Sequence, residues 1–367
     1  MNTESTQGSG ARSTLRLASL AVLLAGLLCG TAGAATSFKG PLDTPSRPSA
    51  LAAKSPLLAV AAAGQRVVGV GLRGHIVYSD DGGRRWAQAR VPVSTDLVAV
   101  TFSSSQKGWA VGHEGVVLHT EDGGQTWARQ LDGREAARIA ESYYAKAVPG
   151  TAYDAVRKQA KAQLVEAEGG APGPFFDVSF DNDSSGYVIG AFNRLFHTDD
   201  GGKTWTPWSD RIDNPGELHL YAIRGSGDQR YIVGEQGKVW RLDAPARRFV
   251  VVPTPYNGSL FGAVVTPASV VVFGMSGTAY RSANQGQSWD KVDIGSRAGI
   301  TGGAMLAGGH MALVNQAGQV LVSEDGGNRF RPIKGLEAMP SYFGMARVGE
   351  RTLGVVGIDG IKVLALP

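Results

Sequence analysis

A glycine turn followed at fixed spacing by an aromatic residue recurs along the 367-residue chain and constrains its fold more than any other feature. The turns are Gly71/Gly74, Gly112/Gly115, Gly234/Gly237, Gly274/Gly277 and Gly357/Gly360, with Gly190/Asn193 and Asn315/Gly318 keeping one glycine each. Twelve residues after the second member stand Trp86, Trp127, Trp205, Phe249, Trp289 and Phe330. The seventh copy ends at Pro367, before its aromatic residue is due.

The spacing of these turns indicates the fold. The second member of successive turns is 41, 78, 44, 40, 41 and 42 residues from the previous one. Repeats of about forty residues built from strands are typical of β-propeller blades. The interval of 78 is one such period plus an insert of about 37 residues. The chain is therefore predicted to be all-β, a seven-bladed β-propeller over residues 55–367 with an insert between blades 2 and 3.

Five copies also carry Ser/Thr-x-Asp-x-Gly-x-x-Trp or a near match, the Asp-box. Its aspartate is expected to accept hydrogen bonds from its own turn, its glycine to adopt angles closed to other residues, and its aromatic residue to pack between blades. Asn284 fits this structural role, because an amide accepts the same bonds but cannot act as a general base. The predicted Asp-box residues are Asp81, Gly83, Trp86, Asp122, Gly124, Trp127, Asp200, Gly202, Trp205, Asn284, Gly286, Trp289, Asp325, Gly327 and Phe330.

The insert, residues 133–170, has the composition of helices. Arg134–Ala147 is rich in Ala, Glu, Arg and Lys, and Thr151 and Asp154 resemble the capping box of a second helix that ends near Glu168. The exposed side carries six basic and five acidic residues, so contacts there should depend on shape and apolar area. The apolar residues expected to be buried are Ile139, Tyr143, Val156 and Leu164.

Residues 1–34 resemble a cleaved secretory signal. Arg12 and Arg16 precede the apolar run Leu17–Leu28, which is too short to span a bilayer, and Ala32-Gly-Ala34 offers small residues for cleavage. Cys29, the only cysteine, permits a lipoprotein alternative, but the preceding leucine is large for a lipobox. No later stretch is apolar enough for a transmembrane helix. The mature protein is predicted to be periplasmic or secreted, without disulfides.

The next segment, residues 35–54, contains three prolines and is predicted to be an extended linker. Part of it is expected to form the outer strand of the last blade, because strands from both termini would close the ring and remove a free edge.

Charge and histidine spacing argue against two classes of function. The formal charge of +4 comes without a cluster of basic residues, so the sequence shows no basic patch of the kind that binds nucleic acid. The six histidines include no pair at i, i+4 and no cysteine assists them, so no metal site is predicted. No cofactor is expected, and no catalytic residue is predicted because the motifs assemble no catalytic constellation.

The motifs also predict which loops share a face. In a four-stranded meander, the second loop and the connection between blades lie on one face, and the first and third loops on the other. The glycine turns and the insert should therefore lie opposite the Asp-boxes. The residues selected there as a candidate partner-binding face are Arg73, His113, Glu114, Phe192, Glu235 and Asp359.

Asp-boxes on a propeller resemble sialidases, and a glycan-binding or glycoside-hydrolase propeller is the alternative function. Sialidases usually carry Phe/Tyr-Arg-Ile-Pro ahead of the first box, whereas this chain has only the scrambled Phe330-Arg-Pro-Ile333, inside its last box.

The closer resemblance is to the photosystem II stability and assembly factor family. It rests on Gly108-Trp-Ala-Val-Gly-His-Glu-Gly115 with His119-Thr-Glu-Asp-Gly-Gly-Gln-Thr-Trp127, and on Gly186-Tyr-Val-Ile-Gly190 with His197-Thr-Asp-Asp-Gly-Gly-Lys-Thr-Trp205. The resemblance covers residues 55–367 and is weakest in blades 4 and 7. It implies a non-enzymatic scaffold that binds a protein client and helps to assemble a membrane or envelope complex from its lumenal or periplasmic side.

The signal is testable by mass spectrometry of the exported protein. We expect an N-terminus near Ala35, because the small residues before it suit signal cleavage. An intact Met1 in an inner-membrane fraction would contradict cleavage, and a lipidated Cys29 would favour the lipoprotein alternative.

Overall fold

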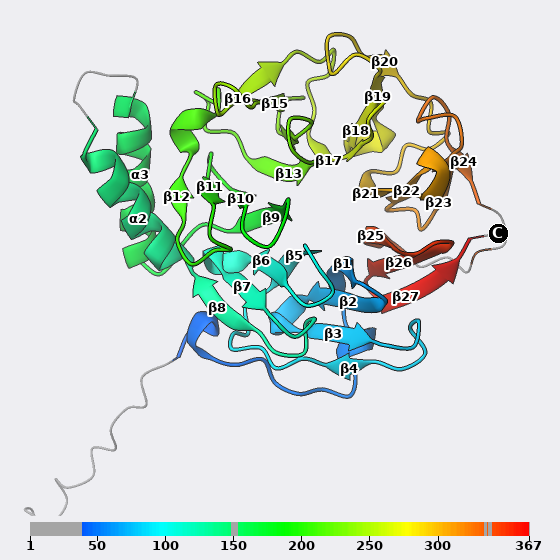
Figure 1. The fold of residues 1–367 in the computed structure, drawn as a ribbon, viewed down its shortest axis with the longest axis horizontal. Helices are drawn as coiled ribbons and strands as arrows, with labels where there is room; N and C mark the ends of the chain where they lie inside the picture. Colours follow the sequence, from blue (N-terminus) through cyan, green and yellow to red (C-terminus); the bar gives the residue numbers. More distant parts are fainter. Residues whose placement is uncertain (1–38, 148–152, 334–335, 337–339, 367) are drawn as a thin grey trace, which may run out of the picture. The chain divides into compact units, whose positions relative to one another are not determined.

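Seven antiparallel sheets surround a central axis in the computed structural model, which describes residues 39–147, 153–333, 336 and 340–366 (Figure 1). Each sheet is one blade, and its strands pair in chain order. The first strand of each blade lines the central cavity. The predicted seven-bladed propeller is confirmed. The leader expected at residues 1–34 lies outside the described residues.

The blades have these strands. Blade 1 has β1 (Leu57–Ala63), β2 (Arg66–Gly71), β3 (Ile76–Ser79) and β4 (Ala87–Gln88); blade 2 has β5 (Leu97–Phe102), β6 (Gly108–Gly112), β7 (Val117–Thr120) and β8 (Ala128–Leu131). Blade 3 has β9 (Phe175–Phe180), β10 (Gly186–Gly190), β11 (Leu195–Thr198) and β12 (Thr206–Pro207); blade 4 has β13 (Leu220–Arg224), β14 (Tyr231–Gly234), β15 (Val239–Asp243) and β16 (Arg248–Val252). Blade 5 has β17 (Leu260–Val265), β18 (Val270–Gly274), β19 (Ala279–Ser282) and β20 (Asp290–Lys291); blade 6 has β21 (Ile300–Met305), β22 (Met311–Asn315), β23 (Val320–Ser323) and β24 (Arg331–Pro332). Blade 7 has β25 (Tyr342–Gly349), β26 (Thr352–Gly357) and β27 (Gly360–Ala365).

The aromatic residue of each repeat packs on the preceding blade. Trp127 of blade 2 lies in a buried cluster with Val68 of blade 1, and Phe330 of blade 6 lies in one with Val271 of blade 5. Truncating a buried aromatic residue to alanine typically costs about 3–5 kcal/mol, so each of these residues is a main contributor to its interface. The same arrangement holds for Trp205, Phe249 and Trp289.

The Asp-box carboxylate is bound by its own turn. In blade 2, Thr120 Oγ1 donates to Asp122 Oδ1 at 2.8 Å and accepts a hydrogen bond from Gly124 N at 2.9 Å. Thr126 donates to Asp122 twice, from its amide at 2.9 Å and from its hydroxyl at 2.6 Å. These bonds fix the turn that delivers the aromatic residue to the neighbouring blade.

The box of blade 5 keeps this geometry with an amide. Asn284 Oδ1 accepts hydrogen bonds from Ser282 Oγ and from Ser288 N, both at 2.9 Å. Its Nδ2 donates to Ser288 Oγ at 2.9 Å, where an aspartate would accept. A negative charge is therefore not needed to form the turn.

The pKa values of the four box aspartates are lowered. Burial alone would raise the pKa of Asp122, but hydrogen bonds from Thr126 and Thr120 outweigh it. The pKa of Asp81 is lowered chiefly by the backbone N–H of Arg85, and those of Asp200 and Asp325 by their own turns against the effect of burial. Each of these four aspartates therefore contributes stability above the unfolded-state pKa of about 3.9, and this stability is lost as the pH falls through the lower folded-state pKa.

The ring closes differently from the sequence prediction. Blade 7 has three strands, and residues 39–56 form no strand, only the 3-10 turns η1 (Pro41–Asp43) and η2 (Ala52–Lys54). The expectation that residues 35–54 supply the outer strand of the last blade is therefore wrong for residues 39–54, and residues 35–38 lie outside the described part. Side-chain packing closes the ring instead: Trp86 and Val67 of blade 1 cluster with Val363 and Ile361 of blade 7.

The segment before blade 1 has a different partner. Ser46 N donates to Val91 O at 3.1 Å, and Ser49 N donates to Gln88 Oε1 at 2.7 Å. Asp43 forms ion pairs with Arg129 and Arg134 at 3.3 and 3.1 Å. The segment thus covers the short outer strand of blade 1, which would otherwise be exposed.

The insert forms α2 (Gly133–Ala145) and α3 (Tyr153–Glu168), which lie outside the ring beside β12 (Figure 1). Asp132 caps α2 by accepting hydrogen bonds from the amides of Arg134 and Glu135. The capping box expected at Thr151 lies outside the described residues.

The predicted buried stripe of the insert is only partly right. Ile139, Val156 and Leu164 are half-buried, but Tyr143 is 38% exposed. The neighbouring Tyr144 is buried instead, because α2 packs through small alanines and turns this residue toward Asp210, to which its hydroxyl donates at 2.8 Å.

We expect Asp122→Asn to retain most of the stability that Asp122→Ala loses, because Asn284 shows that an amide supports the same turn. Losing the hydrogen bonds of a part-buried carboxylate should cost the alanine variant about 1–3 kcal/mol. The asparagine variant should also lose less stability than the wild type between pH 6 and pH 3, because its amide does not take up the proton that the aspartate takes up on unfolding. Thermal melts across this range test both points, and equal destabilisation of the two variants at pH 7 would contradict the account.

Candidate protein-binding face

The glycine turns are tight because they lie directly against neighbouring backbone. A Cβ on Gly112 would come within 2.0 Å of Asp96 O at the start of the inner strand, so only glycine fits there. Gly115 has φ +64 and lies against Gly133, the first residue of α2. The turn between these glycines includes Glu114 at φ 50. The close approach of the first glycine to the backbone therefore holds each turn beside the start of its inner strand.

Four of the six residues predicted for this face are exposed: Arg73, His113, Phe192 and Asp359. The other two turn inward. Glu114 accepts a hydrogen bond from Thr95, and Glu235 Oε2 accepts one from His219 N at 2.8 Å. Burial raises the pKa of Glu114. The structure does not gather the six into one cluster, since they are spread over five different blades, with His113 and Glu114 in the same turn.

The insert supports one turn in particular. Gln159 and Gln163 of α3 are buried and donate to Phe192 O at 2.7 and 3.1 Å. On its other side, Phe192 N donates to His219 Nδ1 at 3.1 Å. The backbone of Phe192 is therefore fixed, while its side chain remains 50% exposed. This places the insert on the glycine-turn side, as the loop order predicts.

A row of aromatic rings extends inward from this turn. The ring of Phe192 meets His219 edge-on at 4.5 Å, and His219 lies 5.9 Å from Phe176. Phe176 lies 5.7 Å from Tyr221, which lies 5.9 Å from Phe261. The row crosses blades 3, 4 and 5 at the ends of their inner strands.

The inner end of this row belongs to a ring of seven residues. Each inner strand has a β-bulge directly after the residue that pairs with the first position of its glycine turn. A bulge re-aims one side chain. The seven bulge residues all line the central cavity and all are half-buried: Leu58, Val98, Phe176, Tyr221, Phe261, Thr301 and Phe343. Six of the seven are apolar or aromatic.

Sequence reasoning missed this ring. A signal was present, because a large residue follows the first buried residue of the inner strand in most repeats. Strand alternation alone assigns that residue to one side of the sheet, and only the bulge brings it to the cavity mouth.

The central cavity has a volume of about 590 Å³ and is lined by all seven inner strands. In its wall, buried Asp177 pairs with Arg224 and accepts a hydrogen bond from Ile223 N at 2.7 Å. Burial raises the pKa of Asp177 in spite of this arginine. The Asp177 carboxylate in the cavity wall is thus paired, whereas the seven bulge residues at the glycine-turn mouth are mainly apolar.

Arg194 lies at the base of the insert, against the backbone of Gly173. Burial lowers its pKa to about 10, although Glu166 opposes the shift. The guanidinium remains charged at neutral pH, and its burial keeps it away from the exposed part of the face.

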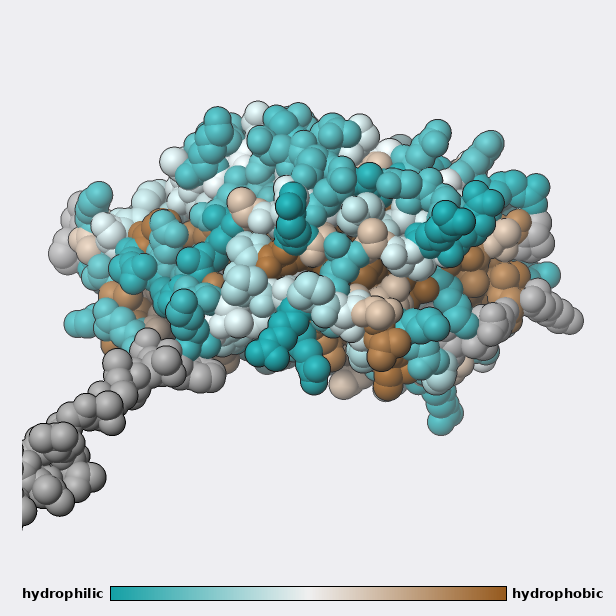
Figure 2. Space-filling view, turned by 90° about the horizontal axis from the view of Figure 1, so that it is seen from below, coloured by the Kyte–Doolittle hydropathy of each residue, from teal (hydrophilic) through white to brown (hydrophobic). Residues whose placement is uncertain are grey.

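Two further apolar side chains stand on the same face. Met275 and Ile358 occupy the glycine turns of blades 5 and 7 and are 49% and 50% exposed. Together with Phe192 they surround the ring of bulge residues. By contrast, the side wall of the molecule is mainly hydrophilic, with small hydrophobic patches (Figure 2).

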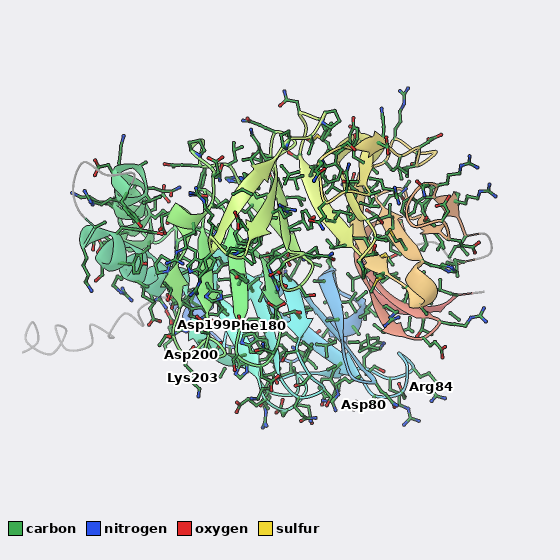
Figure 3. The ribbon with its side chains drawn as sticks, turned by 45° about the horizontal axis from the view of Figure 1, so that its top comes forward. Asp80, Arg84, Phe180, Asp199, Asp200 and Lys203 are labelled. Atoms are coloured by element: carbon green, nitrogen blue, oxygen red, sulfur yellow. The ribbon has the colours of Figure 1, made fainter. Side chains whose placement is uncertain are left out.

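The Asp-box side offers no shared centre in the described residues. Asp80 and Arg84 of the first box lie apart from Asp199, Asp200 and Lys203 of the third (Figure 3). The box carboxylates of Asp81, Asp122, Asp200 and Asp325 are each engaged by their own turns. Within the described ranges, no three His, Cys, Asp or Glu side chains come together as metal ligands would. No helix in those ranges is long and apolar enough to cross a membrane.

A protein-family model matches the chain over two ranges. The model described as "Photosynthesis system II assembly factor YCF48" matches residues 51–137 and 170–291, together more than half of the chain. The unmatched gap between these ranges contains all of α3 and the greater part of α2.

A curated relative is the photosystem II assembly lipoprotein Ycf48 of Synechococcus sp. (strain CC9902). It is 26% identical over 118 residues, which cover 31% of this chain and 35% of the relative. The alignment therefore spans about a third of the relative's length.

Solved structures share the fold. YCF48 bound to a D1 peptide has a TM-score of 0.63 at 16% identity, covering 86% of this chain and 94% of that chain. YCF48 from Cyanidioschyzon merolae has a TM-score of 0.63 at 17% identity, covering 87% and 98%. The WD40 repeats of RRP9 score 0.62 at 9% identity, covering 88% and 97%, so the architecture extends beyond this family.

Proposed function

Because the chain belongs to the photosynthesis system II assembly factor YCF48 family, we propose that it is a non-enzymatic scaffold that binds a protein client and assists assembly of a membrane complex. The client is a subunit of photosystem II or, in a source without photosynthesis, of another membrane or envelope complex. The scaffold acts on the lumenal or periplasmic side, after export by the signal at residues 1–34.

One observation carries the choice of binding face. The glycine-turn side combines a mainly apolar ring at the cavity mouth with the exposed side chain of Phe192, whose backbone is held by two glutamines of α3. Exposed aromatic side chains on a rigid backbone are well suited to protein binding, because little conformational entropy is lost on contact. A protein segment is also the ligand type in a similar structure, YCF48 bound to a D1 peptide.

The engagement of the Asp-box carboxylates supports binding rather than hydrolysis. Each accepts hydrogen bonds from its own turn, and Asn284 replaces one of them without loss of geometry. Most glycosidases need two carboxyl groups that flank one glycosidic bond, and sialidases use a tyrosine nucleophile. The Asp-boxes stand at most one to a blade, around the ring, so their carboxylates form no such pair.

The proposal is tested by replacing Phe192 and Tyr221 with alanine, singly and together. An exposed anchor and its neighbour at the cavity mouth should each contribute more than about 1 kcal/mol to binding, so the double variant should capture at least about tenfold less client. The measurement is quantitative mass spectrometry of proteins cross-linked to the tagged chain in solubilised membranes of the source organism.

Met305→Ala is the matched control, because Met305 is 44% exposed but lies at the far end of an inner strand, on the Asp-box side. Circular dichroism confirms that each variant is folded. Equal loss of client by Met305→Ala, or undiminished capture by the double variant, would contradict the proposed face.

A further inference from the structure

Blade 7 ends in an open strand edge. In the part of the chain that the structure describes, its sheet contains β25, β26 and β27 and no fourth strand. Leu366 N donates to Arg351 O at 2.8 Å. In an antiparallel pair every second residue bonds to the partner strand, so Leu364 and Lys362 face β26 in the same way as Leu366. The amides of Ile361 and Val363, which lie between them, point away from β26. This edge can pair with an added strand.

Among the described residues, the interface between blades 6 and 7 also has no aromatic residue of the repeat. The other six interfaces contain the tryptophan or phenylalanine that follows a glycine turn. The cluster between blades 6 and 7 contains no such residue. Beside it lies a hollow of about 950 Å³ lined by Leu306, Val322, Ile333 and Leu366.

The edge and the hollow adjoin, since Leu366 directly follows β27 and lines the hollow. In the other box-bearing blades the aromatic residue immediately precedes the outer strand, as Trp127 precedes β8. A segment with an aromatic side chain followed by a short extended stretch would therefore fill both positions together.

We propose that this place is a second binding site, which takes an extended segment of a partner protein as the fourth strand of blade 7, with an aromatic side chain in the hollow. The backbone of the segment pairs with β27, and the aromatic side chain packs on Leu306 and Val322. Main-chain bonds give affinity in strand addition, and side-chain pockets give specificity. The hollow is rimmed by Glu324, Asp325 and Arg329 of the Asp-box in blade 6, so the site is separate from the glycine-turn face.

A partner segment is favoured over the chain's own N-terminal residues because, of those described, only η2 lies against β27, beside Gly360 and Ile361, and it is a 3-10 turn that forms no strand with it. Residues 41–49 follow the outer strand of blade 1, where Asp43 pairs with Arg129 and Arg134. The rim of the hollow carries three arginines and three carboxylates: Arg329, Arg331, Arg351, Glu324, Asp325 and Glu350. Because these charges balance, selectivity rests on the apolar pocket and the strand edge.

The test uses a labelled peptide with the sequence of residues 120–131, which contains a box and its outer strand. We expect saturable binding to the full chain by fluorescence anisotropy, weakened at least about tenfold when the tryptophan of the peptide is replaced by alanine. Val322→Glu, which places a charge in the hollow, should abolish binding, whereas Phe192→Ala should not change it. Amide exchange at Val363 should be fast in the free protein and slow in the complex.

Four outcomes would overturn the proposal. The first is no saturable binding, and the second is equal binding of the tryptophan and alanine peptides. The third is slow exchange at Val363 in the free protein that becomes fast when residues 1–38 are removed, which assigns the site to the chain itself. The fourth is dimerisation abolished by Val322→Glu, which assigns it to a second copy. If Val322→Glu does not fold, Leu366→Asp probes the same hollow.

Discussion

The packing of one aromatic residue on the preceding blade is the interaction on which the ring depends. A single blade has two apolar faces and is not stable alone, so each blade needs a neighbour on both sides. The Asp-box makes this contact reproducible: a carboxylate or amide binds the backbone and hydroxyl groups of its own turn and sets the position of the aromatic ring. The charge of the carboxylate adds stability at neutral pH but is not needed for the geometry, as Asn284 shows.

The same constraint separates the two faces of the molecule. Because the Asp-boxes occupy the third loop of five blades, the residues of these loops are needed to hold the blades together, which leaves less of that side for binding. The side chains of the glycine turns do not have this structural role. Their backbone is fixed by close approach to the inner strand, so the side chains they carry are presented in defined positions, and the insert adds further support at Phe192.

The sequence predicts the blades, their order and the faces of their loops, because these follow from motif spacing and the alternation of strand direction. It predicts less well where contacts come from distant parts of the chain. Gln159 and Gln163 are buried because they bind the turn at Phe192, and no helical pattern indicates this. The seven bulge residues reach the cavity through a register shift that strand alternation does not show. The segment before blade 1 follows the short strand β4 rather than blade 7, a choice that depends on ion pairs of Asp43 with residues about ninety positions away.

The central claim is that the client binds over the cavity mouth on the glycine-turn side. Hydrogen–deuterium exchange of the chain, free and bound to its native membrane assembly, tests it most directly. The account predicts slower exchange in residues 190–194, 219–222 and 274–277, with no change in the Asp-box loops at 81–86 and 122–127. Protection confined to the Asp-box loops would contradict it.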